Sequence, residues 1–327
     1  MSQKDQEIPE VTIVIPMFKP NVGFLKDLFN SIVNQDFKEF NIVITDDHSD
    51  KNLIFDNLPF ELLNKTEYIQ NVGAHGIFGN LNNGLRNAHG KYIQIFCQDD
   101  LMLPSFISSN YSNLKNNREI GLVFTSFNFI NNLGEYIKFD RKDITYIPSM
   151  LMAGKCNGYF LYFGCIPGNL SSVMIDRRVF EKLGYFEETY KYAGDFEFWV
   201  RASQSTNILF TREALLLVRD HQNRASRVLS TLMRYNEIKN VYSFLIKNID
   251  IPIPPKTLVR YIHIYIFRSI VSFLLRRNIN LKSSEVKEVF DIFNGNPYTF
   301  RIAFLSFFYP FPTDVQKLKE YMEIIHE

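Results

Sequence analysis

Residues 91–106 read KYIQIFCQDDLMLPSF, an apolar run that ends in two adjacent aspartates. The run predicts a buried strand. Its end is unusual, because the carboxylates of Asp99 and Asp100 raise each other's cost of ionisation unless a cation or hydrogen-bond donors compensate them. Two interpretations follow. One is a turn before a helix that starts near Pro104, and the other is a site for a hard divalent cation such as Mg²⁺.

Strand and helix alternate on the N-terminal side of this run. Apolar, β-branched stretches at 11–16 and 41–45 predict strands buried on both faces. Residues 22–33 carry apolar side chains three and four positions apart, as a helix does, and a short strand is expected near 68–69. This alternation predicts an α/β fold with a mostly parallel, doubly wound sheet, which binds ligands at the carboxyl ends of its strands.

Marked polar chemistry follows three of these strands. It comprises the segment PMFK at 16–19, the pair Asp46 and Asp47, and the pair Asp99 and Asp100. We expect all three strand ends to face one cleft. A nucleoside diphosphate bound with a metal explains both carboxylate pairs, because Mg²⁺ takes one or two carboxylates together with phosphate oxygens. For each pair the alternative is an ordinary turn.

The strand signals fade after about residue 227. We therefore expect an α/β domain at 1–227 and a helical domain at 228–327, with helices over 229–247 and 256–277. The second helix mixes apolar, aromatic and arginine residues, and its charges interrupt it too often for a membrane span. Packing against the first domain is the preferred interpretation, and an interfacial helix on a membrane surface is the alternative.

The composition is that of a globular protein. Hydrophobic residues make up 46% of the 327 positions, which is enough for a large core. The net charge of +1 argues against nucleic acid as a partner. The three cysteines lack C-x-x-C spacing and the N-terminal segment is polar, so we expect a reducing, cytoplasmic setting.

Several motifs in order, TIVIPMFKPN (12–21), IVITDDHSDKN (42–52), AHGKYIQIFCQDD (88–100) and GDFEFWVRAS (194–203), resemble the family 2 glycosyltransferases. The resemblance covers roughly residues 11–226. It implies a GT-A (Rossmann-like) fold and the transfer of a sugar, with inversion, from a nucleotide-sugar donor to an acceptor hydroxyl. For the donor, it implies binding by Pro16, Met17, Phe18, Asp46, Asp47, Asn71, Gly73, Gln98 and Asp99.

The same resemblance implies a metal site for Mg²⁺ or Mn²⁺. Asp99 stands where the family's D-x-D motif ends, and Asp100 and His221 are the further candidate ligands. Cys97 replaces the first aspartate of that motif and, as a soft ligand, suits neither ion. A second departure lies in the Asn- and Gly-rich passage before Gly90. It is about three residues longer than expected, and Leu81 stands where the family has arginine.

The catalytic base implied by the family motif is Asp195, with Glu197 as second candidate. Two residues two apart on a helix point about 200° from each other, so both cannot face the acceptor. Other roles are open to each: Asp195 as a helix N-cap, and Glu197 as an i, i+4 salt-bridge partner of Arg201. Gly194 replaces the acid that usually precedes the base.

Three other functions are alternatives to this one. A nicotinamide-binding Rossmann protein needs G-x-G-x-x-G after the first strand, where this chain has PMFKPNVG (16–23). A nucleotidyltransferase would need a glycine-rich, basic loop there. The third is a degenerate module that binds sugar nucleotides without catalysis, favoured by Cys97 and Gly194. For the transferase we expect a glycan or lipid-linked glycan acceptor from bacterial surface-polysaccharide assembly, with peripheral contact to the inner membrane face and homo-oligomers as further options.

Overall fold

The computed structural model describes residues 9–137, 147–222, 224 and 229–248. The chain divides into two compact units, one of residues 1–156 and 165–222 and the other of residues 157–164 and 223–327. The expected boundary at 227 falls on residues outside the described ranges, as does the expected helix at 256–277.

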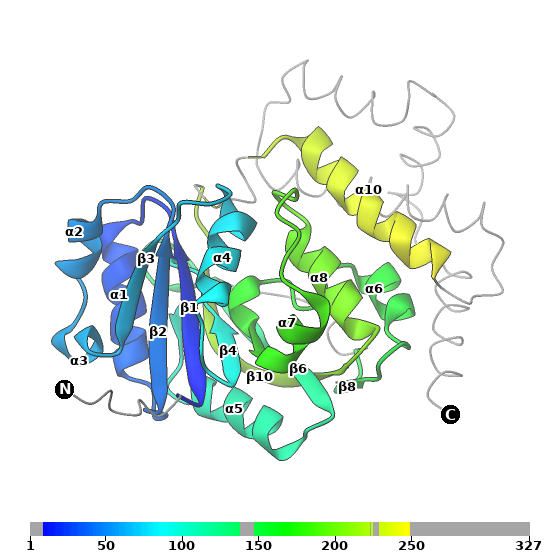
Figure 1. The fold of residues 1–327 in the computed structure, drawn as a ribbon, viewed down its shortest axis with the longest axis horizontal. Coiled ribbons are helices and arrows are strands. Elements are labelled where there is room, and N and C mark those ends of the chain that lie inside the picture. The colour runs from blue at the N-terminus through cyan, green and yellow to red at the C-terminus, as the bar shows by residue number, and fades with distance from the viewer. Residues whose placement is uncertain (1–8, 138–146, 223, 225–228, 249–327) are drawn as a thin grey trace. The chain divides into compact units, whose positions relative to one another are not determined.

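The first unit is built on one mixed sheet with the strand order β3-β2-β1-β4-β9-β6-β10-β5. Figure 1 shows the neighbouring strands β3, β2, β1 and β4. Strands β3, β2, β1 and β4 are parallel neighbours, and so are β6 and β10, whereas β9 runs antiparallel between β4 and β6. The predicted α/β fold with a mostly parallel sheet is confirmed. The strands are β1 (Val11–Met17), β2 (Phe40–Asp46), β3 (Thr66–Gln70), β4 (Tyr92–Ile95), β5 (Leu101–Met102), β6 (Ile120–Ile130), β7 (Tyr136–Ile137), β8 (Met150–Leu151), β9 (Val173–Asp176) and β10 (Asn207–Arg219).

Helices cover both faces of this sheet. The helices of the first unit are α1 (Val22–Val33), α2 (Lys51–Phe55), α3 (Phe60–Leu63), α4 (Ile77–Arg86), α5 (Phe106–Asn116), α7 (Arg177–Leu183) and α8 (Gly194–Ser203), with a 3₁₀ turn at Leu170–Ser172. The second unit contains α6 (Asn157–Phe163) and α10 (Thr231–Lys247), joined by a hydrogen bond from Asn157 Nδ2 to the carbonyl of Asn248, 3.0 Å. Within the described ranges, no helix has both the length and the apolar content to cross a membrane.

Strand β1 is buried on both faces because each face meets a different helix. Its residues Val11, Ile13 and Ile15 belong to the hydrophobic core that also contains the apolar faces of α1 and α5. On the opposite face α4 approaches closely, since a Cβ added at Gly84 would lie 2.8 Å from Val14 Cγ1. Helix α1 starts where the Asn21 side chain accepts a hydrogen bond from the Phe24 N–H, 3.2 Å, an N-cap.

The parallel register brings the polar ends of the first three strands to one level. Met17 pairs with Asp46, and Asp46 in turn pairs with Gln70. Strand β4 pairs with β1 up to Ile95, so the residues that follow it continue alongside the end of β1. The carboxyl edge of the sheet therefore carries the three polar segments that the sequence predicted would lie together.

Candidate active site

The end of β1 is tied to the loop after β4 by a side-chain amide. Gln98 Oε1 accepts a hydrogen bond from the Phe18 N–H, 2.9 Å, and its Nε2 donates to the Phe18 carbonyl, 3.0 Å. Both polar groups of the Phe18 backbone are thus satisfied where the strand ladder has ended. The Phe18 ring stays 54% exposed, and an exposed aromatic face at the edge of the sheet is a surface on which a nucleobase can stack.

Asp46 is enclosed within the turn after β2. Its two carboxylate oxygens accept from the Ser49 N–H at 3.2 and 3.0 Å, and Oδ2 also accepts from the Tyr68 hydroxyl at 2.8 Å. Only 1% of Asp46 is exposed. Burial, and after it the hydrogen bond to Asp46, raises the pKa of the Tyr68 phenol, so Tyr68 remains a donor. Asp46 thus fixes the turn.

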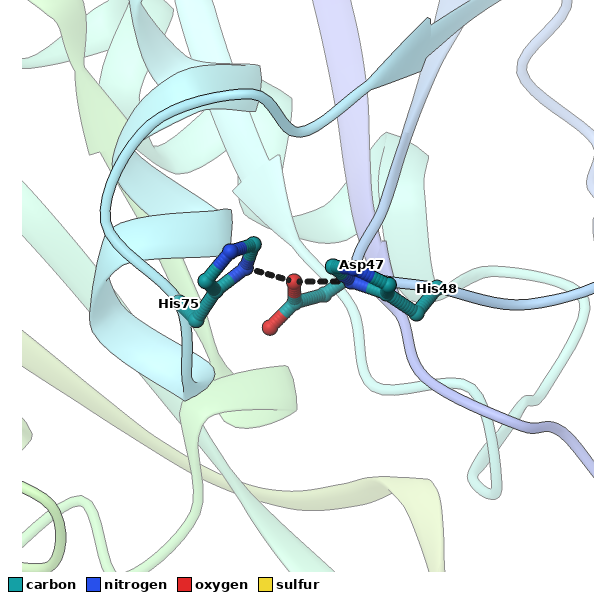
Figure 2. Close-up of side chains that lie close together, drawn as sticks. All are labelled: Asp47, His48 and His75. Atoms are coloured by element: carbon teal, nitrogen blue, oxygen red, sulfur yellow. Dashed lines mark hydrogen bonds and ion pairs between the residues drawn. The ribbon is translucent and has the colours of Figure 1, made fainter.

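Asp47 lies beside two histidines (Figure 2). Its Oδ1 is 2.6 Å from His75 Nδ1 and 3.2 Å from His48 Nδ1, while its Oδ2 accepts from the Gly76 N–H at 2.8 Å. Burial alone would raise the pKa of the Asp47 carboxyl, but the bonds from Gly76, His75 and His48 outweigh it, so its pKa lies below the ordinary value. The histidines were not among the predicted site residues. The DDHSD motif pointed to its acids, and the pairing with His75 becomes apparent only in the fold.

Asn71 and Gly73 shape the loop that carries His75. The Asn71 N–H donates to the Asp46 carbonyl, 2.8 Å, and its Oδ1 accepts from the Gly73 N–H, 3.1 Å. Its Nδ2 donates to the Ala74 carbonyl, 2.8 Å. A side chain that bonds its own backbone two residues on forms an Asx turn. Asn71 is 3% exposed, so the structure gives it a loop-shaping position at the strand end.

The asparagines of α4 explain part of the unusual passage before Gly90. Buried Asn80 donates from Nδ2 to the Met17 and Thr45 carbonyls at 3.0 and 3.1 Å, which joins the ends of β1 and β2. Asn82 donates from Nδ2 to the Phe186 carbonyl, 2.8 Å, and accepts from the Phe186 N–H, 3.1 Å. Sequence reasoning missed both roles, because the partners of Asn82 lie more than 100 positions away.

Asp99 pairs with His221 across two strand ends. Its Oδ2 lies 3.2 Å from His221 Nε2, with 23% of the Asp99 side chain and 10% of the His221 side chain exposed. The His221 ring also packs against the Phe24 ring, with centroids 5.4 Å apart. The structure thus brings together two of the three predicted metal ligands, which are 122 positions apart in the sequence.

Asp100 has a different environment. Its Oδ2 accepts from the Ser171 hydroxyl at 2.6 Å and its Oδ1 from the Arg219 N–H at 3.1 Å, and the residue is 3% exposed. The Ser171 hydroxyl oxygen in turn accepts from the Cys97 N–H at 2.9 Å. Asp100 therefore anchors the loop after β4 to the 3₁₀ turn and to β10.

Arg219 holds this part of the site together and was absent from the predicted site residues. Its guanidinium is fully buried and donates to the carbonyls of Asp99, Asn131 and Asn132 at 3.1, 3.1 and 3.2 Å. It also donates to Asp27 Oδ2 at 2.9 Å. The sequence offered one signal, the R-x-H spacing of Arg219 and His221, but that pattern gives no acceptors for the guanidinium.

Helix α8 begins with the two candidate bases. Asp195 Oδ1 accepts from the Phe196 N–H, 2.7 Å, and its Oδ2 lies 3.9 Å from Cys165 Sγ. Glu197 instead binds Arg201 through both oxygens, at 2.8 and 3.0 Å. Arg201 also donates to the Leu183 and Tyr185 carbonyls, at 2.8 and 2.9 Å, and so connects α8 to the end of α7. The ion pair with Arg201 balances the charge on Glu197 and has a structural role.

The glycine before Asp195 is explained by packing. A Cβ at Gly194 would lie 2.7 Å from the nearest ring atom of Phe78, which is 2% exposed and stacked on Phe186. No real Cβ tolerates such a separation, so an acid at this position would require the Phe78 ring to move.

The sequence and the structure of this chain are similar to those of known proteins. Residues 12–183, just over half of the chain, match the family described as glycosyl transferase family 2. An uncharacterized glycosyltransferase of Rickettsia felis is 24% identical over 249 residues, which cover 74% of this chain and 39% of that protein. The chain thus spans about two fifths of that relative's length.

Two solved structures share the fold at low sequence identity. Staphylococcus aureus TarS in complex with UDP-GlcNAc superposes with a TM-score of 0.61 and 17% identity, covering 86% of this chain and 79% of that one. Mannosyltransferase PcManGT from Pyrobaculum calidifontis, in complex with GDP-Man and Mn²⁺, superposes with a TM-score of 0.57 and 14% identity, covering 97% of this chain and 86% of that one. With the sequence match, these likenesses bear out the predicted family and fold. The chain belongs to glycosyltransferase family 2 and has the GT-A fold.

Proposed function

We propose that this protein moves a sugar, with inversion, from a nucleotide-diphosphate sugar to an acceptor hydroxyl. The observation that carries the proposal is the convergence at the sheet's carboxyl edge. Phe18 and Gln98 are bonded to each other there, and Asp99 faces His221. The solved structures with UDP-GlcNAc and GDP-Man support a nucleotide-sugar donor.

The donor's base would stack on the exposed ring of Phe18, beside Pro16 and Met17. Of the two acids that follow β2, Asp47 is the better partner for the base. Asp46 is 1% exposed and held by its own turn, whereas Asp47 is 5% exposed and its nearest side-chain partners are exposed imidazoles. Base recognition therefore requires one imidazole to yield its place on Asp47 Oδ1.

Asp99 and His221 would hold a divalent cation at the diphosphate. A carboxylate oxygen and an imidazole nitrogen 3.2 Å apart suit Mn²⁺ or Mg²⁺ when phosphate oxygens and water complete the shell. PcManGT, which shares the fold, was solved with Mn²⁺. A cation held there would supply Lewis-acid stabilisation of the nucleotide as it leaves. Asp100 is assigned the anchoring of this loop, because Ser171 and the Arg219 N–H occupy its oxygens.

Asp195 would act as the base. The acceptor oxygen forms a bond to the anomeric carbon on the face opposite the nucleotide, the bond to the diphosphate oxygen breaks, and the hydroxyl proton passes to Asp195. The carboxylate stands at the start of α8, where its Oδ1 accepts a hydrogen bond from the Phe196 N–H. Glu197 is assigned a supporting role through Arg201.

The acceptor is proposed to be a glycan hydroxyl, free or lipid-linked, in bacterial surface-glycan assembly. Residues 256–277 combine apolar and aromatic side chains with four arginines, a composition that suits a membrane surface, and this composition supports the lipid-linked form. Peripheral binding to the inner membrane face would then bring acceptor and enzyme together.

Thermal unfolding with UDP, GDP and TDP, each with and without Mn²⁺, tests donor binding. A nucleotide at a hundred times its Kd stabilises the folded state by about 2.7 kcal/mol. We expect one base to be preferred, with a metal-dependent shift that Asp99→Ala abolishes. An unchanged shift in Asp99→Ala would remove the metal role, and no shift with any nucleotide would contradict the transferase.

Turnover of the preferred nucleotide sugar with a glycan acceptor tests the base. Asp195→Asn should retain the nucleotide shift and lose at least about a hundredfold in transfer rate. Glu197→Gln, the matched control on the same helix, should lower stability and keep measurable transfer. The reverse ranking of the two variants would exchange their roles.

A further inference from the structure

The cluster of Asp47, His48 and His75 contains two histidines to which the proposed transfer reaction assigns no chemical role. Asp47 Oδ1, His48 Nδ1 and His75 Nδ1 all lie within 4.8 Å of one another. The carboxylate is 8% exposed, whereas the two imidazoles are 64% and 61% exposed. Figure 2 shows the two rings converging on one carboxylate oxygen from different segments, the turn after β2 and the loop before α4.

The carboxylate is fixed before any ligand arrives. Asp47 Oδ2 accepts from the Gly76 N–H at 2.8 Å, and the Asp47 N–H donates to the Met17 carbonyl at 2.9 Å. These bonds leave Oδ1 as the oxygen directed at the imidazoles. The side chain that would coordinate an ion therefore loses little freedom on binding.

His48 occupies a backbone conformation that its side chain does not favour. Its φ is +71°, in the left-handed region where glycine or asparagine fits at lower cost. Positions that keep such strain cluster at functional sites. Here the strain directs the His48 ring toward Asp47, with its centroid 4.7 Å from that of His75.

Two imidazole nitrogens and one carboxylate oxygen form a ligand set for a borderline transition metal. Zn²⁺ binds such groups at about 2.0–2.2 Å, which places neighbouring ligand atoms of a tetrahedral site roughly 3.3 Å apart. Asp47 Oδ1 lies 2.6 Å from His75 Nδ1 and 3.2 Å from His48 Nδ1, so small rotations of the exposed rings bring the three atoms to the spacing of a tetrahedral site. Mg²⁺ and Mn²⁺ prefer sets richer in oxygen.

We propose that Asp47, His48 and His75 bind a divalent transition metal of the zinc class, with at least one coordination position open to water or an anion. This site is separate from the Asp99–His221 pair. It lies at the end of β2 rather than at the ends of β4 and β10, and it offers two nitrogens where that pair offers one.

One consequence rests on the proposed function. A metal on Asp47 Oδ1 occupies the atom that we assign to the donor's base, so zinc and nucleotide should compete. Zinc at this site would then lower donor affinity without entering the chemical step.

Co²⁺ titration of the full chain tests the site without reference to activity, because four-coordinate Co²⁺ with nitrogen ligands absorbs strongly in the visible and Zn²⁺ bleaches the band by displacement. We expect a saturable one-equivalent band, with affinity reduced at least roughly tenfold in His75→Ala and in His48→Gly. His48→Gly also relieves the φ strain, so it should fold at least as well as the parent. His89→Ala, which alters another exposed histidine, should leave the band unchanged.

The proposal is overturned if the parent shows no saturable band, or if His221→Ala removes the band while His75→Ala keeps it. Nucleotide titration with and without Zn²⁺ then tests the competition. A nucleotide affinity that Zn²⁺ leaves unchanged would overturn the competition alone. Failure of every nucleotide to bind would refute the proposed function, while the Co²⁺ band would still decide the metal site.

Discussion

Replacing Arg219 with methionine would remove the guanidinium that joins four segments of the first unit. The side chain is fully buried, donates to three carbonyls and to Asp27, and lies 4.3 Å from the centroid of the Phe24 ring. Methionine has similar length and fills the space with apolar atoms, so the change removes the hydrogen bonds with little change in volume.

The magnitude follows from the four bonds that are lost. Each contributes about 1 kcal/mol net, or about 4 kcal/mol together, and burial of the apolar methionine offsets roughly 1 kcal/mol. Asp27 is 51% exposed and recovers water, so it adds no large penalty of its own. We therefore expect a loss of about 3 kcal/mol, equivalent to a fall in Tm of about 6–12 °C for a domain of this size.

Urea unfolding and thermal scans of three variants measure this loss. Arg219→Lys keeps the charge, but three donors on one nitrogen cannot serve four acceptors arranged for a planar fork, so its stability should lie between those of the parent and Arg219→Met. Arg177→Met is the matched control, because Arg177 is 40% exposed and pairs with Glu181 on the surface; it should cost at most about 1 kcal/mol. If Arg219→Met unfolds within about 1 kcal/mol of the parent, the network does not stabilise the site as argued.

Three further changes have expected outcomes. Burial raises the pKa of the Cys156 thiol to about 12. An alkylating reagent at mildly alkaline pH should therefore modify Cys156 far more slowly in the native protein than after denaturation, which peptide mass mapping measures. Equal rates would contradict the burial of Cys156. Hydrogen bonds from Asn82 and then from Arg86 lower the pKa of the Glu188 carboxyl, so the stability that ionised Glu188 contributes is complete above its ordinary pKa and is lost as pH falls through the lowered pKa. The Tm difference between the parent and Glu188→Gln should therefore shrink as pH falls through that range. A constant difference would contradict the prediction. Gly194→Ala should cost about 1–3 kcal/mol against the Phe78 ring, and an unaltered Tm would show that the ring yields freely.

Most of the first half of the fold could be predicted because its signals are local. The apolar runs of β1, β2 and β4 and the spacing in α1 need no distant partner to be recognised. The position of β9 could not be predicted in this way. Val173–Asp176 is a short buried strand that lies antiparallel between β4 and β6, and nothing in four residues specifies paired neighbours that are 49 to 84 positions away.

The same distinction between local signals and distant partners applies to the residues of the candidate site. Residues that project from strand ends, such as Phe18 and Asp99, followed from the parallel topology. Residues that supply hydrogen bonds to these strand ends from distant parts of the sequence could not be predicted. Asn80 joins the ends of β1 and β2, and Arg219 donates to a loop 120 positions earlier. Buried polar groups must find partners, but the sequence does not state which ones.

The two aspartate pairs resolve the electrostatic problem of adjacent carboxylates in the same way. In each pair one carboxylate turns inward and is stabilised by fixed hydrogen-bond donors: Asp46 by Ser49 and Tyr68, and Asp100 by Ser171 and the Arg219 N–H. The other stays nearer the solvent beside histidine, Asp47 with His75 and Asp99 with His221.

The inward residue is the first of the pair after β2 and the second after β4, so position within the motif does not determine the role. Two charges side by side in the sequence are separated in space, and each has its own compensation. The carboxylate that faces a histidine, rather than its position in the motif, identifies the residue that can bind a ligand. On this argument Asp47 and Asp99, and neither of their neighbours, are the acids whose substitution should change ligand binding more than it changes folding.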